Sequence, residues 1–315
     1  MEKHFIWMDC DVGVDDAVAL LTARQLPELE VLGVGAVAGN VGHRYTFPNA
    51  RKILHLAGVN WPVYPGAERP LVREPIDAGD VHGPDGLWGA ELALPEDAPE
   101  TLPAWDALYA AAKAHPGALE LIATGPLTNV AIALEKHPEL KTLLPRILIM
   151  GGAAVGGNCA PVSPKAEFNI FADPDAAEAV FASGVPIVMC GLDVTERAYL
   201  TPGELEKIYA LGGPVARAME AFTRPALRES IAFGLEGLEI HDLCPVLYAI
   251  HPDWFTAQTA AVHVQTRPLE NWGQTLTDLF TPEKQADRHV TVVLDLDREA
   301  FVGTIFRAME KYARA

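Results

Sequence analysis

FIWMDCDVGVDDAVAL, residues 5–20, joins a buried strand to a helix through a short acidic loop. The first part is continuously apolar and ends in aspartate, which is typical of a strand buried in a parallel sheet. Residues 15–26 have the spacing of a helix, with acids in the first turn, where the helix dipole favours them. The stretch contains four aspartates, namely Asp9, Asp11, Asp15 and Asp16. Carboxylates this close together raise each other's pKa unless a positive group lies among them.

Short apolar runs alternate with longer helical patterns along the rest of the chain. The clearest segments are residues 29–58, 118–138, 146–153 and 185–196. This alternation predicts an α/β fold: a single large domain over residues 1–315, with a mostly parallel, Rossmann-like central sheet flanked by helices. In such sheets ligands bind beyond the carboxyl ends of the strands, so we expect the polar residues that follow each strand to converge there. Besides the four aspartates they are Asn40, Thr124, Asn158, Glu167, Asn169 and Asp193.

The composition restricts the kind of ligand. The chain has 315 residues, of which 50% are hydrophobic, enough to build one large core. Its net charge of −18, from 24 basic and 42 acidic residues, argues against nucleic acid as a partner and favours a neutral small molecule or a cation. No segment has the length and apolarity of a membrane span, and the four cysteines show no C-x-x-C pairing. We therefore expect a cytoplasmic protein without a membrane partner.

Residues 65–103 are rich in Gly and Pro and show little periodicity. A loop of this length inside a compact domain is usually functional or mobile. Because His82 lies in its middle, the loop is a candidate to close over a bound substrate.

The aspartates of residues 9–16 allow several interpretations. In a purely structural one, the second pair are acids of a helix N-terminus, and Asp9 or Asp11 is the N-cap. An EF-hand is excluded, because a loop counted from Asp9 would need glycine and glutamate where the chain has Val14 and Leu20.

Two further interpretations give the aspartates a chemical role. Phosphatases of the haloacid-dehalogenase type also place two aspartates, two residues apart, after their first strand, although their motif has Thr or Val where this chain has Gly13. Alternatively the loop is part of a hard-cation site, since Ca²⁺ takes six to eight oxygen ligands, including carboxylates and backbone carbonyls. A further acid must then come from elsewhere, and GLEGLEIHDLCP offers Asp242 beside His241.

A series of motifs resembles the inosine-uridine preferring nucleoside hydrolase family. DCDVGVDD (residues 9–16) matches the D-x-D-x-x-x-D-D signature of that family. The other motifs, in chain order, are GN (39–40), HGPDGL (82–87), ATGPLTN (123–129), MGG (150–152), EFN (167–169) and HD (241–242), with a similar stretch at 262–278. The resemblance implies the nucleoside hydrolase fold, a homodimer or homotetramer, and hydrolysis of the N-glycosidic bond of ribonucleosides to free base and ribose. The transition state is expected to resemble an oxocarbenium ion.

The resemblance also implies a Ca²⁺ site. Its ligands would be Asp11, Asp16, Asp242 and the carbonyl of Thr124, with Asp16 binding through both oxygens. Since Ca²⁺ lowers the pKa of a bound water less than Zn²⁺ does, a carboxylate base is still required, and Asp11 is expected to activate the metal-bound water. The cation would offset the mutual repulsion of the aspartates.

Substrate contacts follow from the same resemblance. His241 is expected to donate a proton to the leaving base, with His82 as a second candidate for catalysis. The ribose-binding side chains are expected to be Asp15, Asn40, Met150, Asn158, Glu167, Asn169 and Asp242.

A histidine at position 241 favours the pyrimidine-preferring or less selective branch, because purine-selective members place an aromatic residue near it. The chain departs from the family pattern in two places: it has Val12 where proline is usual, and its segment FTRPALRESIAFG (222–234) lacks the tyrosines that some relatives use near the base. Arg224, Arg228 or Phe233 are the candidates to replace them. A Ca²⁺-dependent ribonucleoside-binding protein without turnover is a further alternative, although retention of the expected base argues against it.

Overall fold

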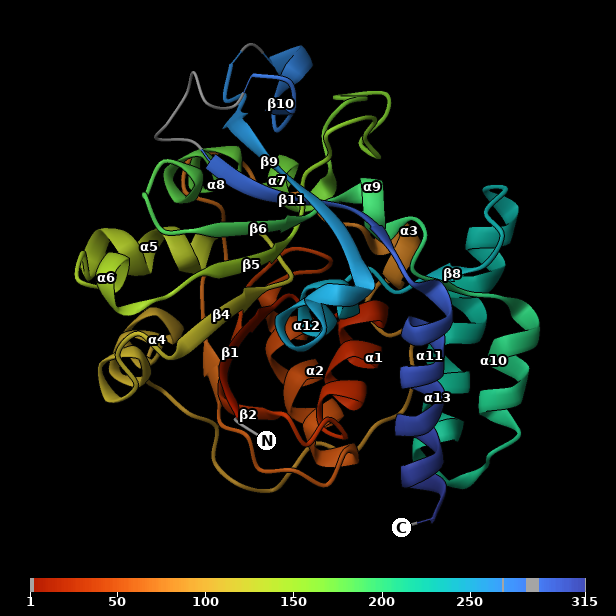
Figure 1. Cartoon of the computed structure of the whole chain (residues 1–315). Helices are drawn as coiled ribbons and strands as arrows, with labels where there is room; N and C mark the ends of the chain where they lie inside the picture. The colour runs from red at the N-terminus through yellow and green to blue at the C-terminus, as the bar shows by residue number, and fades with distance from the viewer. Residues whose placement is uncertain (1–2, 268, 282–288, 315) are drawn as a thin grey trace.

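The computed structural model describes residues 3–267, 269–281 and 289–314. Within these residues a nine-stranded sheet has the strand order β10-β9-β11-β6-β5-β4-β1-β2-β3, and β7 pairs with β8 in a separate small sheet (Figure 1). The strands are β1 (His4–Cys10), β2 (Leu29–Ala36), β3 (Val63–Pro65), β4 (Leu119–Ala123), β5 (Ile147–Met150), β6 (Ile187–Cys190), β7 (Tyr199–Leu200), β8 (Leu238–Glu239), β9 (Phe255–Val264), β10 (Thr275–Asp278) and β11 (His289–Leu296).

The order in which the chain adds strands to the large sheet reverses beside β1. The chain runs from β1 to β2 and β3 on one side, and then returns to add β4, β5 and β6 on the other, all in parallel. Only β9 is antiparallel to its neighbours, β10 and β11. The predicted mostly parallel sheet is therefore confirmed, and the β1/β4 boundary is the topological switch point where ligands of such sheets bind.

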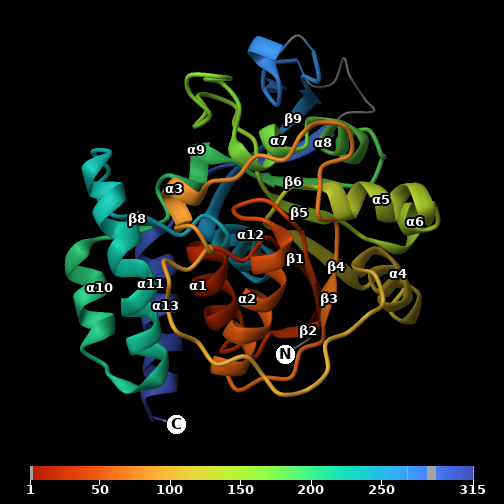
Figure 2. The ribbon, with the colours of Figure 1, turned by 180° about the vertical axis from the view of Figure 1, so that it is seen from behind.

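Helices cover both faces of the sheet, as the opposite views of Figures 1 and 2 show. One buried cluster joins the sheet to α1, α2, α11, α12 and α13, and a second joins it to α4, α5 and α8. The helices are α1 (Val14–Ala23), α2 (His43–Leu56), α3 (Gly79–His82), α4 (Ala104–Ala114), α5 (Thr128–Lys136), α6 (Leu140–Leu143), α7 (Phe168–Ala172), α8 (Pro174–Phe181), α9 (Leu192–Thr195), α10 (Pro202–Tyr209), α11 (Gly213–Ala232), α12 (Leu243–Ile250) and α13 (Arg298–Arg314), with 3₁₀ turns η1 (Pro252–Trp254) and η2 (Leu269–Asn271).

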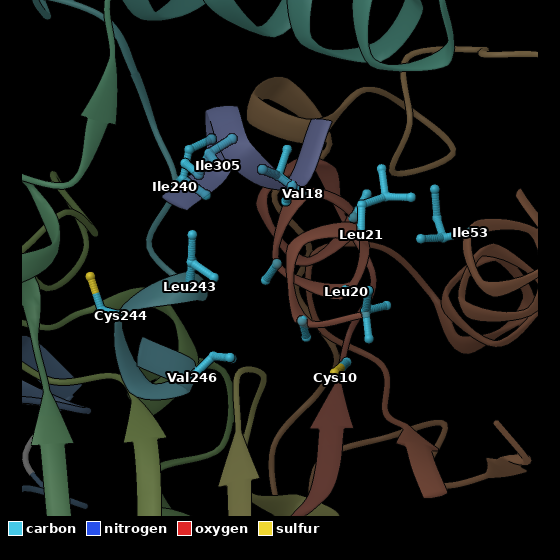
Figure 3. Close-up of a cluster of buried hydrophobic side chains, with 14 of the residues drawn as sticks. Cys10, Val18, Leu20, Leu21, Ile53, Ile240, Leu243, Cys244, Val246 and Ile305 are labelled. Atoms are coloured by element: carbon cyan, nitrogen blue, oxygen red, sulfur yellow. The ribbon is translucent and has the colours of Figure 1, made fainter. Parts of the chain in front are cut away.

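The core packs α1 directly against α12. Leu20 and Val18 of α1 lie in the same buried cluster as Leu243 and Val246 of α12, beside Cys10 at the end of β1 (Figure 3). This packing brings the N-termini of two helices that are far apart in sequence to the end of β1. The acids at the start of each helix are thereby placed together.

Two details correct the structural interpretation of the acidic loop. The N-cap of α1 is Gly13, so neither Asp9 nor Asp11 has that role. Asp16 does support the helix start, because its Oδ2 accepts a hydrogen bond from the Gly13 N–H at 2.9 Å.

The predicted long loop, residues 65–103, is irregular apart from its start in β3 and the one-turn helix α3. None of the helices within the described ranges combines the length and apolarity needed to cross a membrane.

Candidate active site

Asp11 lies immediately beyond β1 and is completely buried. Its Oδ2 accepts the backbone N–H of Asn40 at 2.7 Å, and its Oδ1 has no hydrogen-bond partner. Glycines leave room for it: a Cβ on Gly125 would lie 2.8 Å from the Asp11 carboxyl carbon, and one on Gly39 would overlap Oδ2. Burial and the nearby charge of Asp16 raise the pKa of Asp11 well above its ordinary value.

Three more acids form a tight cluster beside Asp11. Carboxylate oxygens of Asp15, Asp16 and Asp242 all lie within 4.8 Å of one another, and all three residues are buried. Burial and the charge of Asp15 raise the pKa of Asp16 to about 7, and the same two causes raise the pKa of Asp242. Like charges held this close without water are costly unless protons or a cation neutralise them.

Polar neighbours fix the orientation of Asp16. The Thr124 hydroxyl donates to its Oδ1 at 2.8 Å, and the Asn40 amide donates to its Oδ2 at 3.3 Å. Each of these neighbours follows a strand, β4 and β2 respectively, so the convergence predicted from topology brings them onto one carboxylate.

A pocket of about 330 Å³ opens above this cluster. Ten of the twelve residues expected at the site line it: Asp15, Asn40, His82, Thr124, Met150, Asn158, Glu167, Asn169, His241 and Asp242. The other two, Asp11 and Asp16, lie behind the wall, where Asn40 bonds both of them.

The short helix α7 forms one wall of the pocket. Asn169 donates its amide N–H groups to the carbonyls of Thr124 and Met150, at 2.8 and 3.1 Å, so its Oδ1 is left to face a ligand. Glu167 accepts three backbone N–H groups, from Gly152, Asn169 and Ile170. These bonds make Glu167 the N-cap of α7. They also occupy much of the capacity of its carboxylate to accept hydrogen bonds.

Two histidines, His82 and His241, also line the pocket. His241 Nε2 is 3.3 Å from Glu239 Oε2, and its Nδ1 is buried without a partner. Although burial lowers it, the hydrogen bond and charge of Glu239 raise the pKa of His241 to about 9. His82 differs, because its Nδ1 accepts the Val14 N–H at 3.1 Å and burial lowers its pKa. The bond to Val14 ties His82 to the start of α1, and its role as a second catalytic group stays a prediction.

The pocket lining also contains residues that sequence reasoning missed. Glu239, the partner of His241, was not anticipated, and neither were Glu229, Ser230, Leu235 and Leu238. They come from the end of α11, from β8 and from the turn between them.

Of the three candidates to replace the missing tyrosines, only Phe233 lines the pocket, with 71% of its surface exposed. Arg224 instead pairs with Glu206 and Glu220, and Arg228 is not part of the lining. Of the three alternatives, Phe233 is therefore the one that the structure places at the pocket.

Asn158 and Asp193 are associated with the segment between β5 and α7. Asn158 is exposed and reaches the pocket from the segment between β5 and α7. Asp193 does not line the pocket but accepts the N–H groups of Ala154 and Val155, at 2.7 and 3.0 Å, and so holds the base of that segment.

The cluster fits a hard divalent cation. It offers only oxygen ligands, and two buried carboxylate oxygens, Asp11 Oδ1 and Asp15 Oδ1, have no hydrogen-bond partner in the described part of the chain, although Asp15 Oδ1 lies 3.8 Å from His82 Nδ1. Unpaired buried carboxylate oxygens are rare unless a metal or an ordered water completes them. The structure thus provides an acidic cluster that could hold a metal.

Comparison with known proteins identifies the family. The sequence pattern of the inosine-uridine preferring nucleoside hydrolases matches residues 6–303. The pyrimidine-specific ribonucleoside hydrolase RihA of Klebsiella pneumoniae is 40% identical over 313 residues, covering 98% of this chain and 99% of that protein. The non-specific ribonucleoside hydrolase RihC of Escherichia coli is 42% identical over 299 residues, covering 94% and 95%.

Solved structures agree. A purine-preferring ribonucleoside hydrolase from Gardnerella vaginalis superposes with a TM-score of 0.91 at 29% identity, covering 98% of this chain and 99% of that one. The fold and these comparisons place the chain in the class of nucleoside hydrolases. It belongs to the inosine-uridine preferring nucleoside hydrolase family and is an enzyme. The phosphatase and binding-protein alternatives are set aside.

Proposed function

We propose that this enzyme hydrolyses the N-glycosidic bond of ribonucleosides in a Ca²⁺-dependent reaction, with a preference for pyrimidine bases or a broad base range. The observation that carries the proposal is the pocket itself, whose lining joins members of a buried carboxylate cluster, Asp15 and Asp242, to His241, Phe233 and apolar side chains. The base range is supported by the two relatives of about 40% identity, one pyrimidine-specific and one non-specific.

The cation would be held by Asp11, Asp16, Asp242 and the Thr124 carbonyl, with Asp15 within reach of the same cluster. When bound, it would polarise a water molecule and the ribose hydroxyl groups. Its charge would also allow four neighbouring carboxylates to stay ionised in a buried site.

We assign the other catalytic and ribose-binding roles to side chains of the protein. Asp11 takes the proton of the attacking water through Oδ1, the oxygen that no protein group occupies. Asn169 Oδ1 and Asp15 accept hydrogen bonds from the sugar, and the surrounding carboxylates stabilise the positive charge that develops on it. Asn40, Met150, Asn158 and Glu167 complete the ribose-binding wall.

The leaving base needs a proton and a surface to rest on. His241 lines the pocket and is oriented by Glu239, so it is the group we assign to protonate the base. Phe233 adds an exposed ring to the same lining, which can stack on any base.

Sugar release tests the proposal. We would measure reducing sugar from uridine, cytidine, inosine, adenosine and thymidine, with and without a calcium chelator. We expect chelator-sensitive release from the ribonucleosides, highest with uridine or cytidine, and none from thymidine, which lacks the 2′-hydroxyl. Absence of release from every ribonucleoside would overturn the proposal, and release that persists in chelator would overturn its Ca²⁺ dependence.

Assembly and location remain predictions. A homodimer or homotetramer is expected from the resemblance to the family, and light scattering of the purified chain tests it. A cytoplasmic location is tested by fractionation of the source cells.

A further inference from the structure

Helix α7 carries Asn169 but cannot be stable by itself. It has five residues, and isolated helices of that length do not form in water because nucleation costs more than one turn returns. Glu167 satisfies the N–H groups at its N-terminus. The carbonyl groups at its C-terminus need partners from elsewhere in the molecule.

Arg73 supplies such a partner from the long loop between β3 and α4. Its Nη1 donates a hydrogen bond to the Phe171 carbonyl, in the last turn of α7. A guanidinium at this position also interacts favourably with the negative end of the helix dipole. Arg73 therefore caps the helix at the end that Glu167 does not reach.

Two aromatic rings hold the guanidinium in place. Its central carbon lies 4.2 Å from the centroid of the Phe171 ring and 4.4 Å from that of Trp272, just before β10. Gly273 follows Trp272 and has φ of +78°; a Cβ there would lie 2.5 Å from the Phe171 Cα. The loop that carries Arg73 and the segment with Trp272 and Gly273 therefore both pack closely against α7.

This arrangement has a cost in hydrogen bonding. The Arg73 Nε and Trp272 Nε1 groups are both buried and have no partner in the described ranges. Unpaired buried donors reduce stability, so stability alone does not explain why the side chains are arranged in this way. What the arrangement does achieve is a fixed position for α7.

The same loop also leads to the other end of the pocket. Leu71 donates its N–H to Asp173 at 2.8 Å, which anchors the loop at the junction of α7 and α8. A few residues further on the loop forms α3, which carries His82, and the path from β3 past α7 to α3 is visible in Figure 2. The loop that carries Arg73 thus runs between α7 and α3, both of which contribute residues to the pocket lining.

We propose that Arg73 is a positioning residue for substrate: by capping α7 between the Phe171 and Trp272 rings, it holds Asn169 in place to bind the ribose. The inference rests on the proposed hydrolysis of ribonucleosides at this pocket. Arg73 does not touch the substrate, and its effect passes through α7.

The test compares Arg73→Met, Arg73→Lys and Arg69→Met with the wild type, using the best ribonucleoside substrate. Loss of a ground-state contact raises KM and leaves kcat almost unchanged, so we expect KM of Arg73→Met to rise about tenfold while kcat stays within about threefold. Lysine keeps the charge but lacks the planar group that stacks on the rings, so KM of Arg73→Lys should lie between those of the wild type and Arg73→Met. Arg69, in the same loop but exposed and paired with Glu74, is the matched control and should behave as wild type.

Hydrogen exchange of the α7 amides gives a readout that does not depend on turnover. We expect faster exchange of residues 170–172 in Arg73→Met, with the midpoint of thermal unfolding shifted by only a few degrees. Should Arg73→Met fail to fold, Trp272→Leu removes one ring and leaves the cation, and the same rise in KM is expected.

The outcomes separate this inference from the proposed function. An inactive wild type would overturn the function itself. An active wild type with an unchanged KM in both Arg73→Met and Trp272→Leu would overturn only the role of Arg73, as would a fall in kcat without a rise in KM.

Discussion

Asp11 is the side chain on which turnover is expected to depend most. It is fully buried, and only one of its two carboxylate oxygens has a partner. In Asp11→Asn the amide oxygen can still accept the Asn40 N–H, so the fold should be kept while the free oxygen becomes an N–H₂ group. Because a positioned base typically contributes about 10²–10⁴ in rate, we expect kcat to fall by about 10³. Steady-state kinetics with uridine checks this.

Thermal unfolding of Asp11→Asn provides the control. Removing one of several repelling carboxylates should leave the unfolding temperature in chelator equal to or above that of the wild type. Turnover within about tenfold of the wild type would contradict the role of Asp11 as the base.

Phe233 is expected to determine how tightly the base is held. Its ring is 71% exposed at the mouth of the pocket, and a stacked base would cover it. Stacking of a base on an aromatic side chain is worth about 1–3 kcal/mol, so Phe233→Ala should raise KM by about tenfold for purine and pyrimidine substrates alike. Phe233→Tyr should restore most of the loss. Phe280, which is 94% exposed and does not line the pocket, is the matched control: if Phe280→Ala raises KM equally, the assignment is wrong.

Most of the side chains that line the pocket were predicted from the strands that they follow and from the resemblance to the family, and not from the residue type alone. The failures share a physical reason. Glu239 and Glu229 are ordinary surface-type residues in sequence, and the packing of α11 against both α3 and β8 brings them to the pocket. His82 was correctly placed, but its hydrogen bond to Val14 depends on the path of the loop, which no local pattern specifies.

Besides its apolar packing, helix α5 is bonded to the sheet through the side-chain amide of Asn129. Its N–H₂ group donates to both oxygens of Asp9 on β1, at 3.2 and 3.1 Å, and its oxygen accepts the N–H of Ala67 at 2.7 Å. Asp9 is buried, so Asn129→Ala would leave a buried carboxylate without its partner. We expect a loss of about 2–4 kcal/mol in the free energy of unfolding, measured by urea denaturation.

The exposed Asn271 gives the comparison for this change. Asn271→Ala should alter the free energy of unfolding by no more than about 0.5 kcal/mol, as is usual for surface sites. Equal effects of the two substitutions would show that Asn129 has no special role between α5 and β1.

Helix packing also explains what the sequence could not specify about the acidic cluster. Asp15 and Asp16 are neighbours at the start of α1, and their proximity is local. Asp242 joins them only because α12 packs on α1 through Leu243 and Val246 (Figure 3). From the residues alone Asp242 could be named as a candidate, but its partners followed from the resemblance to the family and not from spacing.

The molecule as a whole was predictable where hydrophobic patterning is strong. Continuous apolar runs identified the central parallel strands, and their alternation with helices predicted the sheet and the edge at which the site lies. The pattern is weaker at the borders: β3 has only three residues, and β9 and β10 form an antiparallel edge whose pairing depends on tertiary contacts. Central strands are recognisable as continuous apolar runs, because both of their faces are covered. Edge strands lack this pattern.

The stability of the whole fold is expected to depend on the cation. Folding of the core places Asp11, Asp15, Asp16 and Asp242 in one buried cluster, and burial with mutual repulsion raises the pKa values of Asp11, Asp16 and Asp242. A ligand that binds only the folded state adds about 4 kcal/mol at a thousand times its dissociation constant. For a chain of this size that corresponds to a rise of roughly 5–10 °C in unfolding temperature, so Ca²⁺ added to chelator-treated protein should raise it by this amount.

The variant Asp242→Asn tests whether the cluster binds Ca²⁺, because its expected effect on the unfolding temperature differs between chelator and added Ca²⁺. It removes one repelling charge, so in chelator it should unfold at a higher temperature than the wild type. It also removes a proposed ligand, so the response to Ca²⁺ should be largely lost. Differential scanning calorimetry of both proteins, in chelator and over a Ca²⁺ titration, measures each effect. A wild type whose unfolding temperature does not change with Ca²⁺ would show that protons, and not a cation, neutralise the cluster on which α1 and α12 converge.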